Sequence, residues 1–568
     1  MKMDVSCSKD VICFIIILIC TCLISIPLFH GAIIPDQGDL YCAFIKLNAM
    51  YQSWVYGSWT GRWVPDIFYG YGYPIFNYYP PLFFYLGAVL GFLLGNIVLA
   101  FNMAIFLCLF FSGVAMYLFA REFWGRCGAL LSAVLYLFAP FHIVQLYVLG
   151  WCAQLLALIF FPLVLWGVYR LHHSPSWARG IFLAVSVAGL SLSHNCQTML
   201  FLPVVFVYMV YLEFTGPCPN RPVSFASKVG AMFLGLGISA YFWVPAMLEK
   251  KDIYIEKCIT GWFDFHAHYI KLSQLFFSPW GYDVSTPGQG FSFQIGWPHL
   301  ICCLTFLLMA PWLWKEKKES VRMAVFSLLI AGCAVFMALK PSVLIWEHIP
   351  LLWYVQFPWR FLTIISFFFS FVGGGVLLIQ HRKCRFILGG LLVIVSVLGT
   401  IQHCHPMQFA VVNGKDPAKF LYESTPLDNM ELLPIGVQKM CPLRPGQKLG
   451  YWKGKIDIFN EKVTGGDHHY GVLAYEPTLA VFYSFYFPGW EVYVDGQKVD
   501  IITDNIYGLI MFPLAPGTHT VWVHFSSTPV RDMAGMVSDA SVFILLVLMG
   551  LSVFGRYKKA LSRGIKNS

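Results

Sequence analysis

The sequence predicts a polytopic α-helical membrane protein of about twelve transmembrane helices, with a small extracytoplasmic β-sandwich domain near its C-terminus. Hydrophobic residues make up 58% of the 568 residues and charged residues only 12%, which is too little charge to cover the surface of a soluble protein of this length. Apolar runs of about 17–22 residues, long enough to cross a bilayer, recur along the chain. One long polar stretch, residues 403–530, instead alternates apolar and polar residues as β-strands do.

Twelve apolar segments are the expected membrane spans. A further apolar run, 80–95, begins with two prolines. If 80–95 stays on the outer side, the Lys and Arg residues of every short loop fall in the cytoplasm, as the positive-inside rule requires; a crossing there would invert all later loops. We therefore expect 80–95 to be a re-entrant or interfacial helix and both termini to be cytoplasmic. The expected spans are 11–29, 96–119, 127–140, 151–169, 177–193, 197–213, 228–247, 299–314, 321–339, 359–380, 385–402 and 533–554.

This arrangement divides the chain into three parts. Residues 1–402 form the transmembrane domain, with a large first outer loop at 30–95 and another outer loop at 248–298. Residues 403–530 form the extracytoplasmic β-rich domain. Residues 531–568 supply the last span and a basic cytoplasmic tail, RYKKALSRGIK.

The stretch WEVYVDGQKVDI is the strongest strand signal in the β-rich region. Trp490, Val492 and Val494 alternate onto one face, and Asp495-Gly496 follows them. Asp-Gly is a favoured dipeptide in tight hairpin turns because both of its residues tolerate positive φ. The pattern therefore predicts a β-hairpin that turns at Asp495.

The 17 cysteines lie mostly within apolar runs, where they act as small hydrophobic residues. No pair of CxxC motifs is present, so the cysteines do not predict a zinc site. Cys404 and Cys441 belong to the expected outer region and are a pair that could form a disulfide, which the sequence alone does not decide. The N-terminal MKMDVSCSKD precedes an apolar run without a small-residue cleavage site and is interpreted as part of a retained anchor.

Two carboxylates follow the first predicted span. Asp36 and Asp39 lie three residues apart in IIPDQGDLYCAF, so a helix that begins here would hold both near its positive dipole end. One interpretation is a general base that takes a proton from a nucleophile at the membrane face. The alternative is a helix N-cap that satisfies free backbone N–H groups.

The next candidate is GRWVPDIFYGYGYPIFNYYPPL, residues 61–82. Its rings form either a rigid wall for a sugar or lipid head group or an interfacial aromatic belt. A belt does not need YGYGYP, where glycine and proline fix unusual turns, and this favours a binding site. The candidate binding residues of this stretch are Arg62, Trp63, Tyr71, Tyr73, Asn77, Tyr78 and Tyr79.

Polar residues at the ends of later spans are further candidates, because ionisable groups near the membrane are costly. His194 and Asn195 lie between two spans and would either bind a ligand or join helices by hydrogen bonds. Glu249 stands where another span emerges. His266 and His268 alternate in the following loop, a weak metal pattern.

Arg360, in QFPWRFL, begins a predicted span on the outer side. The other short-loop arginines in this half of the chain are expected to be cytoplasmic, so Arg360 departs from the pattern. A guanidinium there can bind a phosphate through two parallel hydrogen bonds. The alternative is an arginine that snorkels to the interface.

Several of these motifs together resemble a known family. GDLYCAFIKLNAM with the aromatic stretch, APFHIVQLYVLGWCAQLLAL, LSHN, SAYFWVPAMLE, QFPWRFL and FPGWEVYVDGQ are similar to the YfhO-type bacterial membrane proteins, which are often labelled "6-pyruvoyl-tetrahydropterin synthase-related". These proteins in turn resemble the GT-C glycosyltransferases, which take sugars from polyprenyl phosphates outside the membrane. The resemblance covers nearly the whole chain and implies a GT-C-like fold with a re-entrant helix in the first loop.

The resemblance also implies an activity. A catalytic acidic residue in the first outer loop is a GT-C feature, and Asp39 matches that position best, with Asp36 as its neighbour. The implied protein is a glycosyltransferase of the bacterial cytoplasmic membrane that uses a polyprenyl-phosphate-linked sugar and a glycan, lipid or protein acceptor. No cofactor, nucleic acid or P-loop is indicated, and no ligand cluster predicts a divalent metal. The alternatives are a flippase for lipid-linked sugars and a non-catalytic scaffold for envelope assembly.

Overall fold

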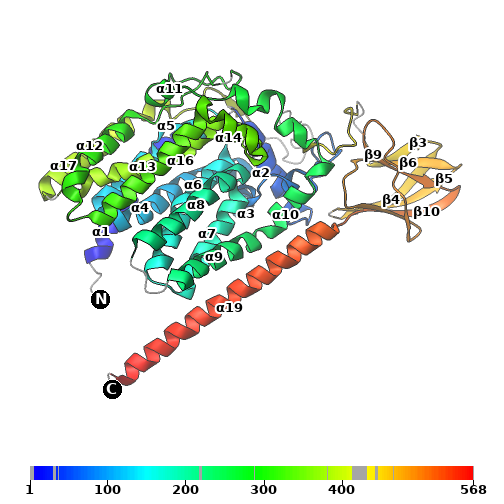
Figure 1. Cartoon of the computed structure of the whole chain (residues 1–568). Helices are drawn as coiled ribbons and strands as arrows, with labels where there is room; N and C mark the ends of the chain where they lie inside the picture. The colour runs from blue at the N-terminus through cyan, green and yellow to red at the C-terminus, as the bar shows by residue number, and fades with distance from the viewer. Residues whose placement is uncertain are drawn as a thin grey trace.

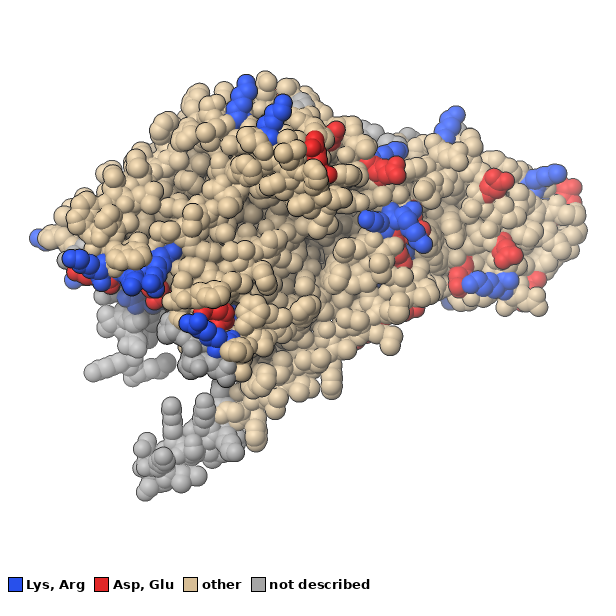
Figure 2. Space-filling view, in the orientation of Figure 1, with Lys and Arg blue, Asp and Glu red and all other residues tan. Residues whose placement is uncertain are grey.

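A computed structural model of the protein describes residues 5–29, 33–35, 38–216, 221–286, 288–379, 381–411, 432–441, 446–464 and 466–566. A bundle of helices forms one part, and a β-sandwich projects from one end of it (Figure 1). The helix α19 (Pro529–Lys566) leads back from the sandwich along the side of the bundle. Figure 2 shows that the flank of the bundle is mostly uncharged, with Lys, Arg, Asp and Glu gathered towards its ends and on the sandwich.

The helices follow the apolar segments of the sequence. The longer ones are α1 (Val5–Ser25), α2 (Leu40–Val55), α4 (Ile97–Leu137), α6 (Cys152–His173), α7 (Trp177–Ser193), α8 (Asn195–Thr215), α9 (Arg221–Ile238), α12 (Trp297–Leu313), α13 (Lys318–Ala338), α16 (Leu362–Gly373) and α17 (Arg382–Leu398). The shorter ones are α3 (Leu82–Leu94), α5 (Pro140–Tyr147), α10 (Ala240–Leu248), α11 (Leu272–Phe276), α14 (Val343–His348) and α15 (Pro350–Trp353). The 3₁₀ helices are η1 (Ile26–Phe29), η2 (Ile75–Asn77), η3 (Lys250–Asp252), η4 (Ile255–Cys258), η5 (Gly261–Phe263), η6 (Phe265–Ala267), η7 (Lys340–Ser342), η8 (Pro358–Phe361), η9 (Gly374–Leu378) and η10 (Ile401–His403).

Among the described residues, eight helices are long and apolar enough to cross a membrane, or nine if the pair α9 and α10, bent by 73°, is one span. The protein is thus a polytopic helical membrane protein, as predicted. Each of the twelve predicted ranges contains helix, but the count by length and composition is lower than twelve. The physical reason is that α7 and α12 are short, and that α4 is counted as one helix.

Helix α4 folds back on itself at its middle. Gly125 has φ 66° and ψ −174°, which is not helical. A methyl group at Gly113 would lie 3.0 Å from Cδ1 of Leu137, although the two residues would be about 36 Å apart in a straight helix. The two halves of α4 are therefore a helical hairpin, with its turn where the sequence analysis separates two spans.

Helix α3 is the run that we expected not to cross the membrane. Its 13 residues extend about 20 Å, less than the roughly 30 Å of a hydrocarbon core. It ends at Gly95, a left-handed C-cap with φ 64°, and packs between α2 and α4. Its length fits a re-entrant or interfacial helix.

The β-domain is a sandwich of two antiparallel sheets. The strand order is β4-β5-β10-β7-β8 in one sheet and β3-β6-β9 in the other. The two sheets enclose an apolar core that includes Val472, Phe482 and Val523. Its strands are β3 (Leu449–Lys453), β4 (Ile456–Thr464), β5 (Asp467–Ala474), β6 (Thr478–Phe485), β7 (Trp490–Val494), β8 (Gln497–Val499), β9 (Leu509–Leu514) and β10 (Gly517–Phe525).

The predicted hairpin is confirmed. Strands β7 and β8 pair antiparallel, and the turn residues Asp495 and Gly496 have φ 52° and 79°, as a two-residue turn of this type requires. Trp490 and Val492 are buried, whereas Val494 is half-buried.

The segment before the sandwich belongs with the bundle. Strand β2 (Phe409–Val411) pairs with β1 (Ile33–Pro35) of the first loop, and the Tyr254 amide donates to Leu433 O at 3.3 Å. Cys404 and Cys441 are both free thiols, so the disulfide that the sequence left open is not formed in this structure.

Candidate functional site

Asp39 lies at the N-terminus of α2, where the first long loop meets the bundle. It occupies the N-cap position without making a side-chain capping bond. Its amide donates to Leu149 O at 2.8 Å, and the backbones are so close that a methyl group at Gly150 would lie 2.2 Å from Leu40 N. Only glycine fits at Gly150, so this contact fixes Asp39 beside the first residue of the next turn, Trp151.

Trp151 connects Asp39 to Arg360. The indole Nε1 donates to Asp39 Oδ2 at 3.0 Å. The same ring stacks on Trp359 with centroids 5.3 Å apart, and the Arg360 guanidinium lies over its face at 4.6 Å. The structure therefore brings together the two residues that the sequence analysis placed in catalytic and phosphate-binding roles.

Arg360 is buried, with 7% of its surface exposed. Its Nη1 donates to Val355 O at 2.7 Å and to Gln356 Oε1 at 2.8 Å, and it also contacts Cys196 Sγ at 3.4 Å. Nε is buried without a hydrogen-bond partner. Within the described part of the chain no carboxylate forms an ion pair with Arg360, so its charge is held by neutral acceptors and aromatic rings.

The link between α7 and α8 adds two of the predicted residues. His194 caps α8 by accepting a hydrogen bond from the Gln197 amide at 3.3 Å, and it lies close enough to Arg360 to interact with its charge. Asn195 donates to Tyr78 O at 3.0 Å. His194 thus belongs to the Asp39–Arg360 cluster, and Asn195 connects the cluster to the aromatic stretch.

Lys46 is a member of the cluster that the sequence analysis missed. Its Nζ lies 4.2 Å from the centre of the Tyr79 ring, and only 4% of the residue is exposed. Tyr79 interacts electrostatically with Lys46, Asp39 and Arg360. The available signal was the spacing: Lys46 follows Asp39 by two helical turns and therefore lies on the same face of α2.

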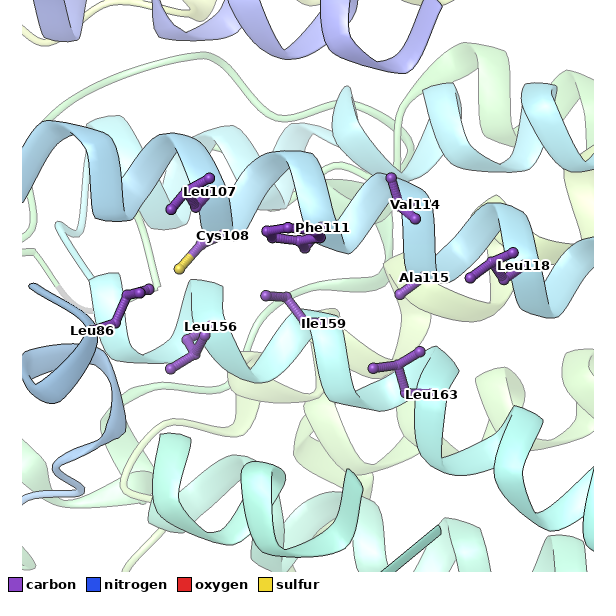
Figure 3. A pocket seen from close by; sticks show the side chains of 10 residues that line it. All are labelled: Leu86, Leu107, Cys108, Phe111, Val114, Ala115, Leu118, Leu156, Ile159 and Leu163. Carbon is purple, nitrogen blue, oxygen red and sulfur yellow. The ribbon is translucent and has the colours of Figure 1, made fainter. Parts of the chain in front are cut away.

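An apolar groove of about 360 Å³ runs between α3, α4 and α6 (Figure 3). Its floor and walls are almost entirely carbon. Leu156 of the groove lies one helical turn after Cys152, the first residue of α6, and the preceding Trp151 donates to Asp39. One end of the groove therefore adjoins the polar cluster. The lining residues are Leu86, Leu107, Cys108, Phe111, Val114, Ala115, Leu118, Leu156, Ile159 and Leu163.

Glu249 lies outside this cluster, in a buried ion pair with the last helix. Its Oε2 accepts from Arg531 Nε at 2.9 Å, and its Oε1 bonds to the Thr528 hydroxyl. The Tyr78 hydroxyl donates to Glu249 O at 2.8 Å, and Arg531 Nη1 donates to Pro488 O at 3.0 Å. Glu249 therefore joins α10 to the start of α19 and to the sandwich.

Arg62 and Asn77 hold the first loop in shape. Arg62 Nη1 donates to Asn77 Oδ1 at 3.2 Å, and Asn77 Nδ2 donates to Arg62 O at 2.6 Å. Arg62 Nη2 also donates to Tyr241 O at 2.9 Å. Burial lowers the pKa of Arg62, an effect to which the nearby Arg531 charge adds.

The rings at the centre of the aromatic stretch pack against the sandwich. Tyr71 is fully buried and stacks on Phe485 at 5.2 Å. Trp63 packs against Trp490, 5.5 Å away, and a methyl group at Gly72 (φ 84°) would lie 2.5 Å from the Trp63 ring. This packing explains both the rings and the glycine without a ligand.

Tyr73 is also fully buried, against Phe68 at 5.0 Å. Of the seven candidates in residues 61–82, Tyr79 lies in the Asp39 cluster and Tyr78 borders it through Asn195. Trp63 and Tyr71 contact the sandwich. Arg62 and Asn77 bond to each other, and Tyr73 packs within the loop. Asp36 lies outside the described residues.

Lys448 connects the sandwich to the first loop through hydrogen bonds. Its Nζ donates to Gly70 O and, at 3.3 Å, to Pro65 O. Burial lowers the pKa of Lys448 to about 8, and the nearby Asp66 opposes this shift. Burial raises the pKa of Asp66.

The two histidines of the loop at 248–298 make protein contacts. His266 Nδ1 lies 2.7 Å from Asp264 Oδ1, and this hydrogen bond raises the pKa of His266. Burial lowers the pKa of His268. No group of three or more potential metal ligands is found among the residues that the structure describes.

The helical bundle and the sandwich define a polytopic membrane protein with a polar cluster at one end. The chain belongs to the family described as "6-pyruvoyl-tetrahydropterin synthase related domain; membrane protein", whose sequence profile matches residues 76–407. An uncharacterized protein of Lactococcus lactis subsp. cremoris (strain MG1363) is 27% identical over 248 residues, which cover 42% of this chain and 40% of the relative.

Several solved structures are similar at low sequence identity. They are the arabinofuranosyltransferase AftD from Mycobacteria (15% identity, 70% of this chain and 27% of that chain, TM-score 0.40), the oligosaccharyltransferase of Archaeoglobus fulgidus (13%, 69% and 55%, 0.38) and ArnT from Cupriavidus metallidurans bound to undecaprenyl phosphate (14%, 68% and 63%, 0.35). This chain spans less than two thirds of the length of each of these proteins.

Proposed function

We propose that the protein is a membrane glycosyltransferase that moves a sugar from a polyprenyl-phosphate-linked donor to an envelope acceptor on the outer face of a bacterial cytoplasmic membrane. The observation that carries this proposal is the Asp39–Trp151–Arg360 arrangement. The Arg360 guanidinium lies 4.6 Å above the face of the Trp151 ring. The N–H of the same ring donates to the Asp39 carboxylate at 3.0 Å. A proton acceptor and an anion-binding group are thereby held side by side at one end of the bundle.

Each group has a role in a single transfer step. Asp39 takes the proton of the acceptor hydroxyl, whose oxygen forms the new bond to the anomeric carbon. The bond from that carbon to the phosphate oxygen breaks, and its electron pair leaves with the lipid phosphate. Arg360, and Lys46 from α2, stabilise the negative charge that develops on the phosphate. Neither a nucleotide nor a metal is needed for this balance of charge and protons.

The groove between α3, α4 and α6 suits the lipid portion of such a donor. Its lining is apolar, and it adjoins the Asp39 cluster at the start of α6, where Trp151 lies. A prenyl chain that lies in the groove would place its phosphate at the polar cluster. The burial of apolar surface would supply affinity, while the cluster would orient the reacting atoms.

The proposed orientation needs twelve membrane crossings. The hairpin in α4 supports two crossings there, and the short length of α3 supports a re-entrant helix. With both termini in the cytoplasm, a reporter fused at Gly95 or within 403–530 should report the outer side. Fusions at Lys317 and Ser568 should report the cytoplasm. A cytoplasmic signal at Gly95 would contradict the twelve-span arrangement.

The decisive experiment uses the full chain in liposomes with a panel of radiolabelled polyprenyl-phosphate sugars and envelope extract as acceptor. We expect label to pass to the acceptor, with and without EDTA. Label that crosses the bilayer while it remains on the lipid would instead identify a flippase. If the full panel gave neither transfer nor translocation, the protein would be a scaffold and the proposal wrong.

A further inference from the structure

A second cavity, of about 240 Å³, lies between the ends of α6 and α8 and the start of α13. Helix α6 begins at Cys152 near Asp39 and ends at His173, which lines the cavity. Its 22 residues extend about 33 Å, so this cavity lies at the end of the bundle opposite the proposed catalytic cluster.

The cavity combines aromatic walls with positive charge. Phe123, Tyr169 and Tyr211 supply the rings. Lys318 and Arg322 also line it; each lies 5.9 Å from the Trp314 ring. In the described portion of the chain neither cation forms an ion pair with a carboxylate.

Glu319, the acidic residue among the lining residues of this cavity, contacts two other lining residues. Glu319 Oε1 accepts from the Tyr169 hydroxyl at 2.9 Å and lies 3.4 Å from His173 Nε2. Glu319 is therefore held by Tyr169 and His173, and the two charges of Lys318 and Arg322 exceed its single negative charge.

His172, directly behind the cavity, offers a further donor. Lys228 Nζ lies 3.0 Å from His172 Nδ1, and an ammonium group can only donate, so Nδ1 accepts and the proton resides on Nε2. Nε2 is buried and has no hydrogen-bond partner among the residues that the structure describes. It lies 2.5 Å from where a methyl group would stand at Gly216, a residue that lines the cavity.

We propose that this cavity binds the phosphate of an anionic membrane phospholipid. The Arg322 fork and the Lys318 ammonium are suited to a phosphate group, and the His172 N–H lies on the same side of the cavity as Gly216. The cavity opens where helices end and where aromatic rings and basic residues meet the head-group layer. Basic pockets between transmembrane helices at this depth are typical of lipid head-group sites.

The test measures the melting temperature of the purified full chain in a neutral detergent with added phosphatidylglycerol, phosphatidylcholine or inorganic phosphate. We expect phosphatidylglycerol to raise the melting temperature and the other two additions to leave it nearly unchanged. The double variant Lys318→Gln/Arg322→Gln should weaken the apparent affinity for phosphatidylglycerol by about tenfold or more, because charge-assisted hydrogen bonds are lost. Arg322→Lys alone, which retains the charge, should keep most of the effect.

The matched control is Lys315→Gln/Lys317→Gln, which removes two exposed lysines from the same loop that do not line the cavity. It should keep the full response. An equal loss in both double variants would show a general charge effect and overturn the proposal, as would equal stabilisation by phosphatidylcholine. Stabilisation by inorganic phosphate alone would assign the site to a soluble anion and overturn the lipid assignment. None of these outcomes depends on glycosyl transfer.

Discussion

Two buried arginines at the same end of the molecule differ in how their charges are balanced. Arg531 lies against aromatic rings and forms an ion pair with Glu249 at 2.9 Å, in which both side chains are almost completely buried. Arg360 also lies against aromatic rings, but its hydrogen bonds run to neutral acceptors. Among the described residues Arg531 has a carboxylate in direct contact, and Arg360 has none.

This difference separates a structural group from one that is available to a ligand. A buried charge is costly unless it is paired. Glu249 balances Arg531 in the absence of any ligand, whereas Arg360 gains a full partner only when an anion such as a phosphate arrives. In the sequence, Arg531 and Arg360 are both basic residues near the start of a predicted span. Only the residues that they contact in the structure distinguish the two.

The largest effect is expected from Asp39→Asn. The amide retains the shape of the side chain and can still accept the Trp151 N–H, but it cannot take a proton. Loss of a general base lowers rates by roughly 100- to 10,000-fold, whereas loss of a helix cap would cost only about 0.5–2 kcal/mol of stability.

The measurement is transfer from the radiolabelled donor, normalised to the amount of folded protein. Asp36→Asn is the control and should retain a substantial share of the activity. Full activity in Asp39→Asn would refute the catalytic role, and a loss confined to Asp36→Asn would move that role three residues upstream.

Glu249→Gln tests the other side of the comparison. It should leave the Arg531 charge buried without its counter-ion and reduce the free energy of unfolding by about 3–5 kcal/mol. The double variant Glu249→Gln/Arg531→Met should be less destabilised than the single one, because it buries no charge. Thermal unfolding of the full chain in detergent provides the measurement, and a double variant that is no more stable than the single would contradict the ion-pair interpretation.

Arg360→Lys is expected to have a smaller effect. Lysine keeps the charge but lacks the planar fork and stacks less well on Trp151. The KM for the lipid-linked donor should rise about tenfold with little change in melting temperature, since one charge-assisted hydrogen bond is worth roughly 1.5 kcal/mol. If Arg360→Ala left the donor kinetics unchanged, Arg360 would not bind the donor phosphate and would only anchor its helix at the membrane interface.

Local sequence patterns predicted individual helices and strands, but not the distant residues against which they pack. The Asp495-Gly496 hairpin followed from turn chemistry, a property of adjacent residues. The expectation that 80–95 does not cross the membrane followed instead from where Lys and Arg lie along the whole chain. Tyr71, by contrast, is contacted by the Ser484 hydroxyl across 413 residues of sequence. Rings and glycines in the first loop indicated a rigid surface, but only tertiary packing shows that Trp63 and Tyr71 face the sandwich.

In the candidate site, too, single residues could be predicted from the sequence but their contacts could not. Asp39 and Arg360 were each recognisable as ionisable residues at the ends of spans, yet their junction is Trp151, a residue that the sequence analysis did not single out. Lys46 was missed because a single lysine in an otherwise apolar helix carries no motif. Its buried position is visible only once Tyr79 is placed over it.

The smallest predicted effect extends the comparison to a third buried group, His468 in β5 of the sandwich. It is 5% exposed, and its Nδ1 lies 3.4 Å from the Tyr470 hydroxyl. Burial, helped by the Lys448 charge, lowers the pKa of His468 to about 3, well below the value of about 6.5 in an unfolded chain. Like Arg360, it forms no ion pair with a carboxylate among the described residues, although the Asp467 charge opposes the shift. Unlike Arg360, it can remain neutral.

The sign of the resulting pH dependence follows from these pKa values. Above pH 6.5 His468 is neutral in both states and its contribution to stability is complete. As the pH falls from about 6.5 towards 3, the unfolded state binds a proton that the folded state does not, and the free energy of unfolding falls by at most about 1.4 kcal/mol per pH unit. Hydrogen exchange of β5 amides in the full chain, compared at pH 7 and pH 5, should show this loss. His468→Leu should remove that component of the pH dependence and the exposed neighbour variant His469→Gln should not; the same pH dependence in His468→Leu would assign the acid sensitivity to other groups.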